Sequence, residues 1–203
     1  PRAIHSTLEA TKLMREAAEA AGAPKGSIHC MSYPTLEGTN ELMRNKLTSV
    51  ILATGSGAMV KAAYSSGTPA YGVGPGNSVQ MVAEDANAID AAGKIMMSKA
   101  FDYATSCSSE NSVIIQESQY DQVMSEFIRL GGVLITGDDR VKLENHMWPV
   151  NAKGYRSING SIVAQSALKI AQDAGLTVPE STKVLLVEGI KDLVSDFFSQ
   201  EKL

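Results

Sequence analysis

Residues 51–78 read ILATGSGAMVKAAYSSGTPAYGVGPGNS, a pattern that predicts a strand, a helix and a second strand in that order. The run from Ser49 to Ala53 is apolar and rich in β-formers, which is typical of a buried parallel strand. Gly67 closes the helix that follows, and residues 70–74 have the composition of the next strand. This succession predicts the doubly wound sheet of an α/β protein.

The turn between the first strand and the helix reads Thr54-Gly55-Ser56-Gly57, which is compatible with phosphate binding, although the motif by itself is more often an ordinary turn. Two glycines let the backbone approach a ligand closely, and a helix N-terminus offers unpaired N–H groups to an anion. The full dinucleotide fingerprint places a third glycine at position 60, where this chain has Val60. An ordinary turn between a strand and a helix therefore stays open as the alternative.

The residues before this unit predict two more helices and a short strand. Ser6 and Glu9 have the spacing of a capping box, so a helix should open there and run to about Ala21. A short strand is expected at residues 27–31, followed by a helix at residues 35–44. The α/β pattern therefore extends towards the N-terminus.

A glycine-rich turn at residues 72–77 interrupts the pattern, and we place a domain boundary near it. The first predicted domain covers residues 1–75 and the second covers residues 76–203. The elements expected in the second domain are helices at residues 86–101, 120–130 and 162–174, and strands at residues 113–116, 133–136 and 183–188. The second half is therefore α/β as well.

Charge and composition exclude several classes of protein. The formal net charge of −4 comes without the clustered Lys and Arg side chains that nucleic-acid binding requires. No apolar run approaches the roughly 18–20 residues needed to cross a bilayer, and the first residues show no signal-peptide pattern. Two cysteines make no disulfide framework and suit a reducing compartment. We therefore expect a cytoplasmic protein that binds neither nucleic acid nor membrane, and a piece of a longer chain, since it begins with Pro1.

Cys107 is the candidate nucleophile. It lies in ATSCSS (residues 104–109), where small neighbours leave room for a substrate beside the sulfur. The predicted loop between a helix and a strand should expose the thiol, and a reactive thiol needs access and a stabilised thiolate. A free cysteine can also be a buried, inert packing residue. The local sequence leaves these two interpretations evenly balanced.

The other polar residues give weaker signals. Cys30 falls in the short predicted strand among apolar residues, so we interpret it as a packing residue. No second Cys/His pair has zinc spacing, so no metal site is expected. Glu110, three residues after the candidate nucleophile, is a candidate to support it, although a capping or solvent-facing role is the favoured interpretation.

Residues 51–78, together with FDYATSCSSENSVII (residues 101–115) and GLTVPESTKVLLVEG (residues 175–189), resemble the aldehyde dehydrogenase superfamily, specifically its CoA-acylating branch. That branch includes the aldehyde half of bifunctional aldehyde–alcohol dehydrogenases and the acylating succinate-semialdehyde dehydrogenases. The blocks also match in order and spacing, so the resemblance covers essentially the whole chain. It implies the C-terminal part of a Rossmann-like cofactor domain over residues 1–75, followed by an α/β catalytic domain, incomplete at its C-terminus, over residues 76–203.

The resemblance also implies roles for individual residues. Cys107 takes the position of the catalytic nucleophile, and Glu201 is similar in placement to the glutamate that holds the nicotinamide ribose. Ser56 and Gly57 fall at the helix start that lies against the cofactor pyrophosphate. The full set of cofactor-binding residues expected in this chain is Thr54, Gly55, Ser56, Gly57, Gly74 and Glu201.

The reaction implied by the resemblance uses NAD or NADP as cofactor and coenzyme A as co-substrate. The Cys107 thiolate adds to the carbonyl of a small aldehyde, hydride leaves for the nicotinamide, and CoA captures the resulting thioester. The full-length protein is expected to be a homo-oligomer. The segment expected to supply an oxyanion-binding asparagine is not in this chain.

One departure from the family pattern bears on the product. Hydrolytic aldehyde dehydrogenases carry a glutamate ahead of a glycine pair, and the matching place here is Gly72. General-base assistance is typically worth about 10²–10⁴-fold, so water attack without it should be slow. A thiol is far more ionised than water near neutral pH and needs less assistance. The missing carboxylate favours a thioester product over a free acid.

Two alternatives remain open at this point, a hydrolytic aldehyde dehydrogenase and a noncatalytic nucleotide-binding or assembly module. The sequence of residues 70–78 is similar to the corresponding sequence of enzymes that act on short anionic aldehydes, such as succinate semialdehyde or sulfoacetaldehyde. A cation would then meet the anionic tail, and Lys153 and Arg156 are the candidates. The interpretation of both as ordinary surface residues is favoured, since Lys and Arg are mostly exposed.

Overall fold

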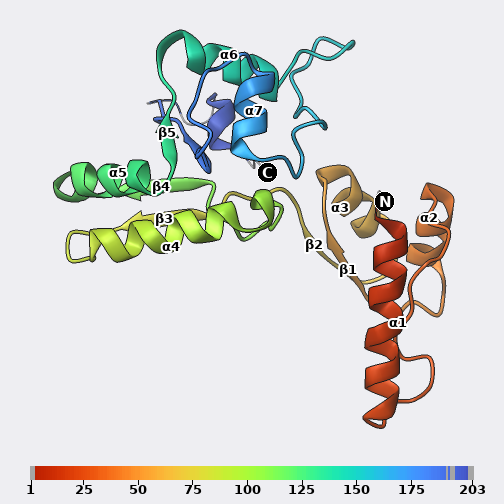
Figure 1. Ribbon diagram of the computed structural model, residues 1–203. Coiled ribbons are helices and arrows are strands. Elements are labelled where there is room, and N and C mark those ends of the chain that lie inside the picture. The colour runs from red at the N-terminus through yellow and green to blue at the C-terminus, as the bar shows by residue number, and fades with distance from the viewer. Residues whose placement is uncertain (1–2, 191, 193–194, 201–203) are drawn as a thin grey trace. The chain divides into compact units, whose positions relative to one another are not determined.

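The computed structural model describes residues 3–190, 192 and 195–200 (Figure 1). The chain divides into two compact units, Pro1–Pro75 and Gly76–Leu203. Each unit combines helices with a parallel pair of strands, so the α/β fold class is confirmed. That the first unit binds a cofactor and the second carries catalysis stays a prediction.

The first unit is built around a strand–helix–strand motif. Its elements are α1 (Ile4–Ala20), α2 (Leu36–Arg44), β1 (Ile51–Thr54), α3 (Gly57–Tyr64) and β2 (Ala70–Val73). Strands β1 and β2 are parallel, with Ile51 paired with Ala70 and Thr54 with Val73. A small core forms where Met43, Ala53 and Ala63 are buried together. The strand–helix–strand unit predicted from residues 51–78 is therefore confirmed.

Two details predicted for the first unit are wrong. Helix α1 begins at Ile4, before Ser6, and its N-cap residue Ala3 makes no side-chain hydrogen bond. The capping box is absent because the N-cap residue lies three residues earlier than the spacing implied, which is nearly one turn. Residues 27–31, all described, form no strand. Backbone groups of a strand need a partner, and none of the described strands runs beside this segment.

The second unit contains two parallel strand pairs. Its elements are β3 (Val79–Val82), α4 (Ala88–Ala100), η1 (Phe101–Ala104), β4 (Ser112–Ile115), η2 (Glu117–Gln119), α5 (Tyr120–Arg129), β5 (Gly132–Leu134), α6 (Gly137–Met147), α7 (Ala167–Asp173), β6 (Val184–Leu186) and η3 (Phe197–Ser199). Strand β3 pairs with β4, and β5 pairs with β6. Helices α4 and α5 lie beside the β3–β4 pair (Figure 1).

Two hydrophobic clusters hold the second unit together. One joins α4 and α5 to the strands through buried Val82, Met96, Val123 and Phe127. The other gathers around Trp148, whose ring meets that of Phe198 edge-on with centroids 5.1 Å apart. Aromatic pairs in this geometry add about 0.5–1.5 kcal/mol beyond the area they bury.

The sequence predictions for this unit miss two elements and misplace one boundary. Strand β3 and helix α6 were not expected. Helix α6 reads GDDRVKLENHM and buries only Leu143 and Met147, so its sequence shows little apolar periodicity. Helix α7 begins at Ala167, where the Ser166 hydroxyl accepts from the Lys169 N–H, and not at residue 162. Ile162 is nevertheless 2% exposed, because it belongs to the core around Trp148 while its backbone forms a turn. Among the described residues, no helix is long and apolar enough to cross a membrane.

Candidate active site

The turn after β1 brings most of the predicted cofactor-binding residues together. Thr54 ends β1 and Val73 ends β2, and the Gly55 N–H donates to the Val73 carbonyl at 3.1 Å. Gly74 directly follows β2, so it leaves the sheet at the same carboxyl edge. In open parallel sheets, ligands bind outside this edge. The geometry therefore suits a ligand, and the cofactor role of these residues remains a prediction.

The start of α3 has a capped first turn with open space beside Gly57. Ser56 is the N-cap residue, and its hydroxyl accepts from the Met59 N–H at 3.3 Å. Gly55 has a φ of 155°, a backbone conformation that side chains rarely adopt. A Cβ added at Gly57 would meet nothing within 4 Å, so space is open above the first turn. The N–H groups of a first helical turn lack intrahelical partners and can bind a phosphate.

Gly72 allows α3 to pack closely on β2 although Val60 stands where the dinucleotide fingerprint has its third glycine. In that fingerprint the third glycine allows the helix and strand to pack closely. Here Val60 occupies its place, and a Cβ added at Gly72 would lie 2.5 Å from Val60 Cγ1 and 2.9 Å from Tyr64 Cε2. The Gly72 N–H also donates to the Tyr64 hydroxyl at 2.9 Å. The close approach of α3 to β2 is thus made possible by a glycine on the strand.

Cys107 lies in the second unit, in the loop between η1 and β4, and is exposed, whereas Cys30 is half-buried. The Ser78 hydroxyl donates to the Cys107 carbonyl at 3.1 Å and so connects the loop to the start of β3. Ser109 is 2% exposed and donates to the Ser106 carbonyl at 2.9 Å. A fixed backbone with an exposed thiol is the arrangement that a nucleophile requires.

The chain enters this loop through a left-handed turn. Asp102, Tyr103 and Ala104 have φ values of 49°, 51° and 61°. For residues other than glycine this conformation costs roughly 1–2 kcal/mol each. The Thr105 hydroxyl donates to the Asp102 carboxylate at 2.6 Å and stabilises the turn. Backbone strain of this kind tends to occur at functional sites, and here it lies three residues before Cys107.

A polar cluster lies beneath the loop. The Lys99 ammonium group donates to Asn111 Oδ1 at 3.1 Å, and burial lowers the pKa of Lys99 to about 8, although the Glu110 carboxylate acts in the opposite direction. Glu110 Oε2 is buried and has no hydrogen-bond partner among the residues that the structure describes. Glu110 as a whole is half-buried, so the capping or solvent-facing role favoured from the sequence stays a prediction, while the buried oxygen leaves a supporting role open.

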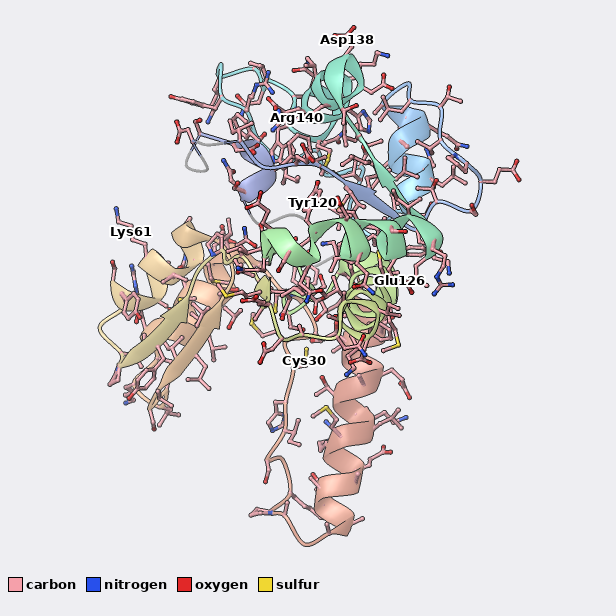
Figure 2. All side chains as sticks on the ribbon, turned by 90° about the vertical axis from the view of Figure 1, so that its left-hand side faces the viewer. Cys30, Lys61, Tyr120, Glu126, Asp138 and Arg140 are labelled. Carbon is pink, nitrogen blue, oxygen red and sulfur yellow. The ribbon has the colours of Figure 1, made fainter. Side chains whose placement is uncertain are left out.

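These residues face a cavity of about 810 Å³ inside the second unit. Its polar wall near the loop is formed by Asn77, Lys99, Tyr103, Glu110 and Asn111, and much of the rest is apolar. Tyr120, labelled in Figure 2, begins α5 and donates to Glu188 Oε1 at 2.5 Å. Both residues also line the cavity. That hydrogen bond raises the pKa of Tyr120. Sequence reasoning missed Lys99, because one lysine in the last turn of a helix is ordinary.

The remaining predicted residues lie elsewhere. Arg156 donates to Glu144 Oε1 at 3.0 Å and to Asn145 Oδ1 at 2.8 Å, and its guanidinium group lies 5.3 Å from the centroid of the Phe197 ring. These contacts favour a structural role, and binding of an anionic tail by Arg156 stays a prediction. Lys153 is exposed in a turn. Glu201 lies outside the described residues.

Arg156 is part of a larger ionic network. Glu144 also receives Arg140, labelled in Figure 2, whose second ion pair is with Asp196 at 3.1 Å. Asp196 is 2% exposed and accepts in addition from the Phe198 N–H. This network fastens the segment around η3 to α6. Among the described residues, no three His, Cys, Asp or Glu side chains gather as metal ligands.

Comparison with known proteins identifies relatives over the whole chain. The chain is 59% identical over 203 residues to a sulfoacetaldehyde dehydrogenase of an Acholeplasma species. This alignment covers 100% of the chain and 41% of the relative. It is 52% identical over 202 residues to the acylating sulfoacetaldehyde dehydrogenase of Bilophila wadsworthia, covering 43% of that protein. The chain thus spans about two fifths of the length of these curated relatives.

Solved structures agree. The acetylating aldehyde dehydrogenase of Geobacillus thermoglucosidasius matches 94% of this chain and 41% of its own, with a TM-score of 0.82 and 44% sequence identity. A propionaldehyde dehydrogenase of Rhodopseudomonas palustris, solved with bound propionyl-CoA, matches 95% of this chain and 42% of its own, with a TM-score of 0.79 and 29% identity.

The resemblance noted from residues 51–78, 101–115 and 175–189 is therefore confirmed, including its direction towards acylating enzymes. Residues 3–174 match the aldehyde dehydrogenase family as a whole. That match covers most of the chain, and the α/β units described above have the fold of its solved members. This chain belongs to the aldehyde dehydrogenase family.

Proposed function

We propose that the full-length protein oxidises a short aldehyde to its acyl-CoA, with NAD or NADP as hydride acceptor and Cys107 as nucleophile. The observation that carries the proposal is the Cys107 loop, which presents an exposed thiol among small residues on a backbone held by Ser78. The acylating activities named for the relatives support the same chemistry.

The residues of the first unit fit a dinucleotide. The open space at Gly57 and Gly74 leaves room for a pyrophosphate close to the backbone, and the first turn of α3 offers N–H groups to it. Thr54, Gly55 and Ser56 would complete this cradle. The nicotinamide cofactor, when bound, supplies the acceptor for the hydride that leaves the thiohemiacetal.

The role of Cys107 follows from its chemistry. Its thiolate adds to the aldehyde carbonyl, and the oxygen gains the negative charge of a tetrahedral adduct. The backbone N–H of Cys107 is a candidate donor to that oxygen. After hydride departure the acyl group remains on sulfur as a thioester, which the CoA thiolate attacks, so that Cys107 leaves as thiolate.

The absence of a carboxylate in residues 72–76 supports CoA over water as the acyl acceptor. We therefore expect the full-length enzyme, given aldehyde, NAD(P) and CoA, to form acyl-CoA, and to turn over at least about tenfold more slowly without CoA because water attack lacks a general base. Mass spectrometry of the products decides between the two outcomes. Equal turnover without CoA, with free acid as product, would contradict the proposal and favour a hydrolytic enzyme.

We further propose that the substrate is a short anionic aldehyde, because the most similar relatives reported above are named for sulfoacetaldehyde. Homo-oligomerisation of the full-length protein is part of the same proposal.

Arg156 offers a test of how an anionic tail would be held. Since its guanidinium group is already committed to Glu144 and Asn145, we expect Arg156→Gln to change kcat/KM for sulfoacetaldehyde and for acetaldehyde by the same factor, within about twofold. Steady-state kinetics with both aldehydes checks this. A selective loss with the anionic substrate of about tenfold or more would instead assign tail binding to Arg156.

A further inference from the structure

Lys99 closes the loop that carries Cys107. It lies in the last turn of α4, three residues before the left-handed turn, and its ammonium group reaches Asn111, immediately before β4, at 3.1 Å. The two residues that this hydrogen bond joins therefore stand on either side of the loop. Because the bond spans the loop at its base, it restricts how far the loop can move.

A chain of hydrogen bonds continues from Asn111 to Cys107 itself. The Asn111 N–H donates to the Ser78 carbonyl at 2.9 Å, and the Ser78 hydroxyl donates to the Cys107 carbonyl at 3.1 Å. Ser78 thus accepts a hydrogen bond from Asn111 with its backbone carbonyl and donates one to Cys107 with its side chain. A displacement at Lys99 would be transmitted to the backbone of Cys107 through two further bonds.

The surroundings of Lys99 do not stabilise its charge well. Burial costs an ammonium group its hydration, and the nearby Glu110 has a buried carboxylate oxygen without a partner among the described residues. Two such groups are costly to bury, and apolar residues would often serve stability as well or better. The titratable groups that line the same cavity are Tyr103, Glu110, Tyr120, Lys183, Glu188 and Asp196. Tyr120 is bonded to Glu188, and Asp196 to Arg140, whereas Glu110 acts directly on Lys99.

We propose that Lys99 is a positioning residue for the acyl transfer, which holds the Cys107 loop through Asn111 and Ser78 and is balanced by the carboxylate of Glu110. The inference rests on the proposed function and concerns the same site. Lys99 acts only through its neighbours and does not need to touch the substrate.

The protonation state of Lys99 makes the proposal testable by pH. Its pKa of about 8 means that the ammonium form holds below this pH and that the proton is lost as the pH rises through it. Deprotonation removes the attraction to Glu110 and one donor, so the loop should loosen and kcat should fall on the alkaline side. A guanidinium group stays charged throughout this range, so Lys99→Arg should move that fall to higher pH.

The experiment compares the full-length enzyme with its Lys99→Met and Lys99→Arg variants in the acyl-CoA assay from pH 6 to 10. We expect Lys99→Met to lower kcat about ten- to a hundredfold with little change in the KM for aldehyde, since misplacement of a reacting group by about 1 Å costs on this scale. Lys99→Arg should regain part of kcat and shift the alkaline fall upward. Lys94→Met is the matched control, because Lys94 is exposed on the same helix and pairs with Asp90.

The outcomes separate the inference from the proposed function. If the unaltered enzyme forms no acyl-CoA, the proposed function fails. If it is active but Lys99→Met keeps its kcat, or Lys99→Arg leaves the alkaline fall where it was, the positioning role is overturned while the function stands. Should Lys99→Met not fold, the pH profile of Lys99→Arg decides alone.

Discussion

Replacing Cys107 by alanine in the full-length protein is expected to abolish acyl-CoA formation, with kcat lowered by roughly 10⁴-fold or more, as for other enzymes that lose their nucleophile. The physical reason is that no other described side chain of the loop can form a thioester. Ser106, Ser108 and Ser109 are hydroxyls bonded to the loop itself, and without an adjacent general base a hydroxyl is a weak nucleophile.

Cys30 provides the matched control within the same chain. It is half-buried in the first unit and its thiol faces the Met31 carbonyl at 3.7 Å, so Cys30→Ala should leave kcat within about twofold. A mass spectrum of the intact enzyme after aldehyde and NAD(P), without CoA, should show one acyl adduct, and digestion should place it on Cys107. An adduct on Cys30, or full activity of Cys107→Ala, would remove the nucleophile from the mechanism and favour a noncatalytic module.

The parts of the fold that the sequence predicts well are those encoded locally. The unit from Ile51 to Val73 combines two apolar runs, a glycine turn and a glycine stop, and each signal lies within a few residues of the element that it specifies. Other helices and strands recur to within two residues at each end, as with α5 and β4. Predictions fail where the partner of a segment decides its structure, as at residues 27–31, which pair with none of the strands that the structure describes.

The features of the candidate site also divide into those that the local sequence shows and those that depend on distant contacts. Small residues around Cys107 can be recognised in the sequence because they are its neighbours along the chain. The bond from Lys99 to Asn111 joins residues 12 positions apart, and the link from Ser78 to Cys107 joins residues 29 positions apart. The lack of a partner for Glu110 Oε2 among the described residues also depends on the fold. Residue type alone does not distinguish Lys99 from Lys94 on the same helix, since only the fold leaves Lys99 half-buried and Lys94 exposed.

Gly72 is a residue whose interpretation changes once its contacts in the fold are known. The sequence marks it as the place of a missing catalytic carboxylate, whereas in the structure it makes room for Val60 and Tyr64. That Gly72 takes the place of the catalytic glutamate stays a prediction, and it is compatible with the packing, because a residue that must lack a side chain cannot carry a carboxylate.

We therefore expect Gly72→Ala to lower the free energy of unfolding by about 1–3 kcal/mol, the usual cost of overpacking, and Gly72→Glu to lower it further. Gly74→Ala is the matched control, because a Cβ at Gly74 would meet nothing within 4 Å, and its effect should stay within about 0.5 kcal/mol. Chemical denaturation of each variant measures these differences. Equal stability of Gly72→Ala and Gly74→Ala would show that the close contact does not constrain the chain.

A double variant tests whether contact with Val60 causes the loss of stability in Gly72→Ala. Since the nearest contact of the added Cβ is Val60 Cγ1 at 2.5 Å, Val60→Ala should relieve part of the strain of Gly72→Ala, with a coupling of about 0.5–3 kcal/mol in a double-mutant cycle. The contact with Tyr64 would keep the rescue incomplete. A carboxylate grafted at position 72 would then have to displace α3, whose first turn is the proposed anion site, before it could activate water. We therefore expect Gly72→Glu to lose acyl-CoA formation without gaining free acid, because the crowded position at residue 72 would not let a glutamate side chain reach the acyl group without moving α3.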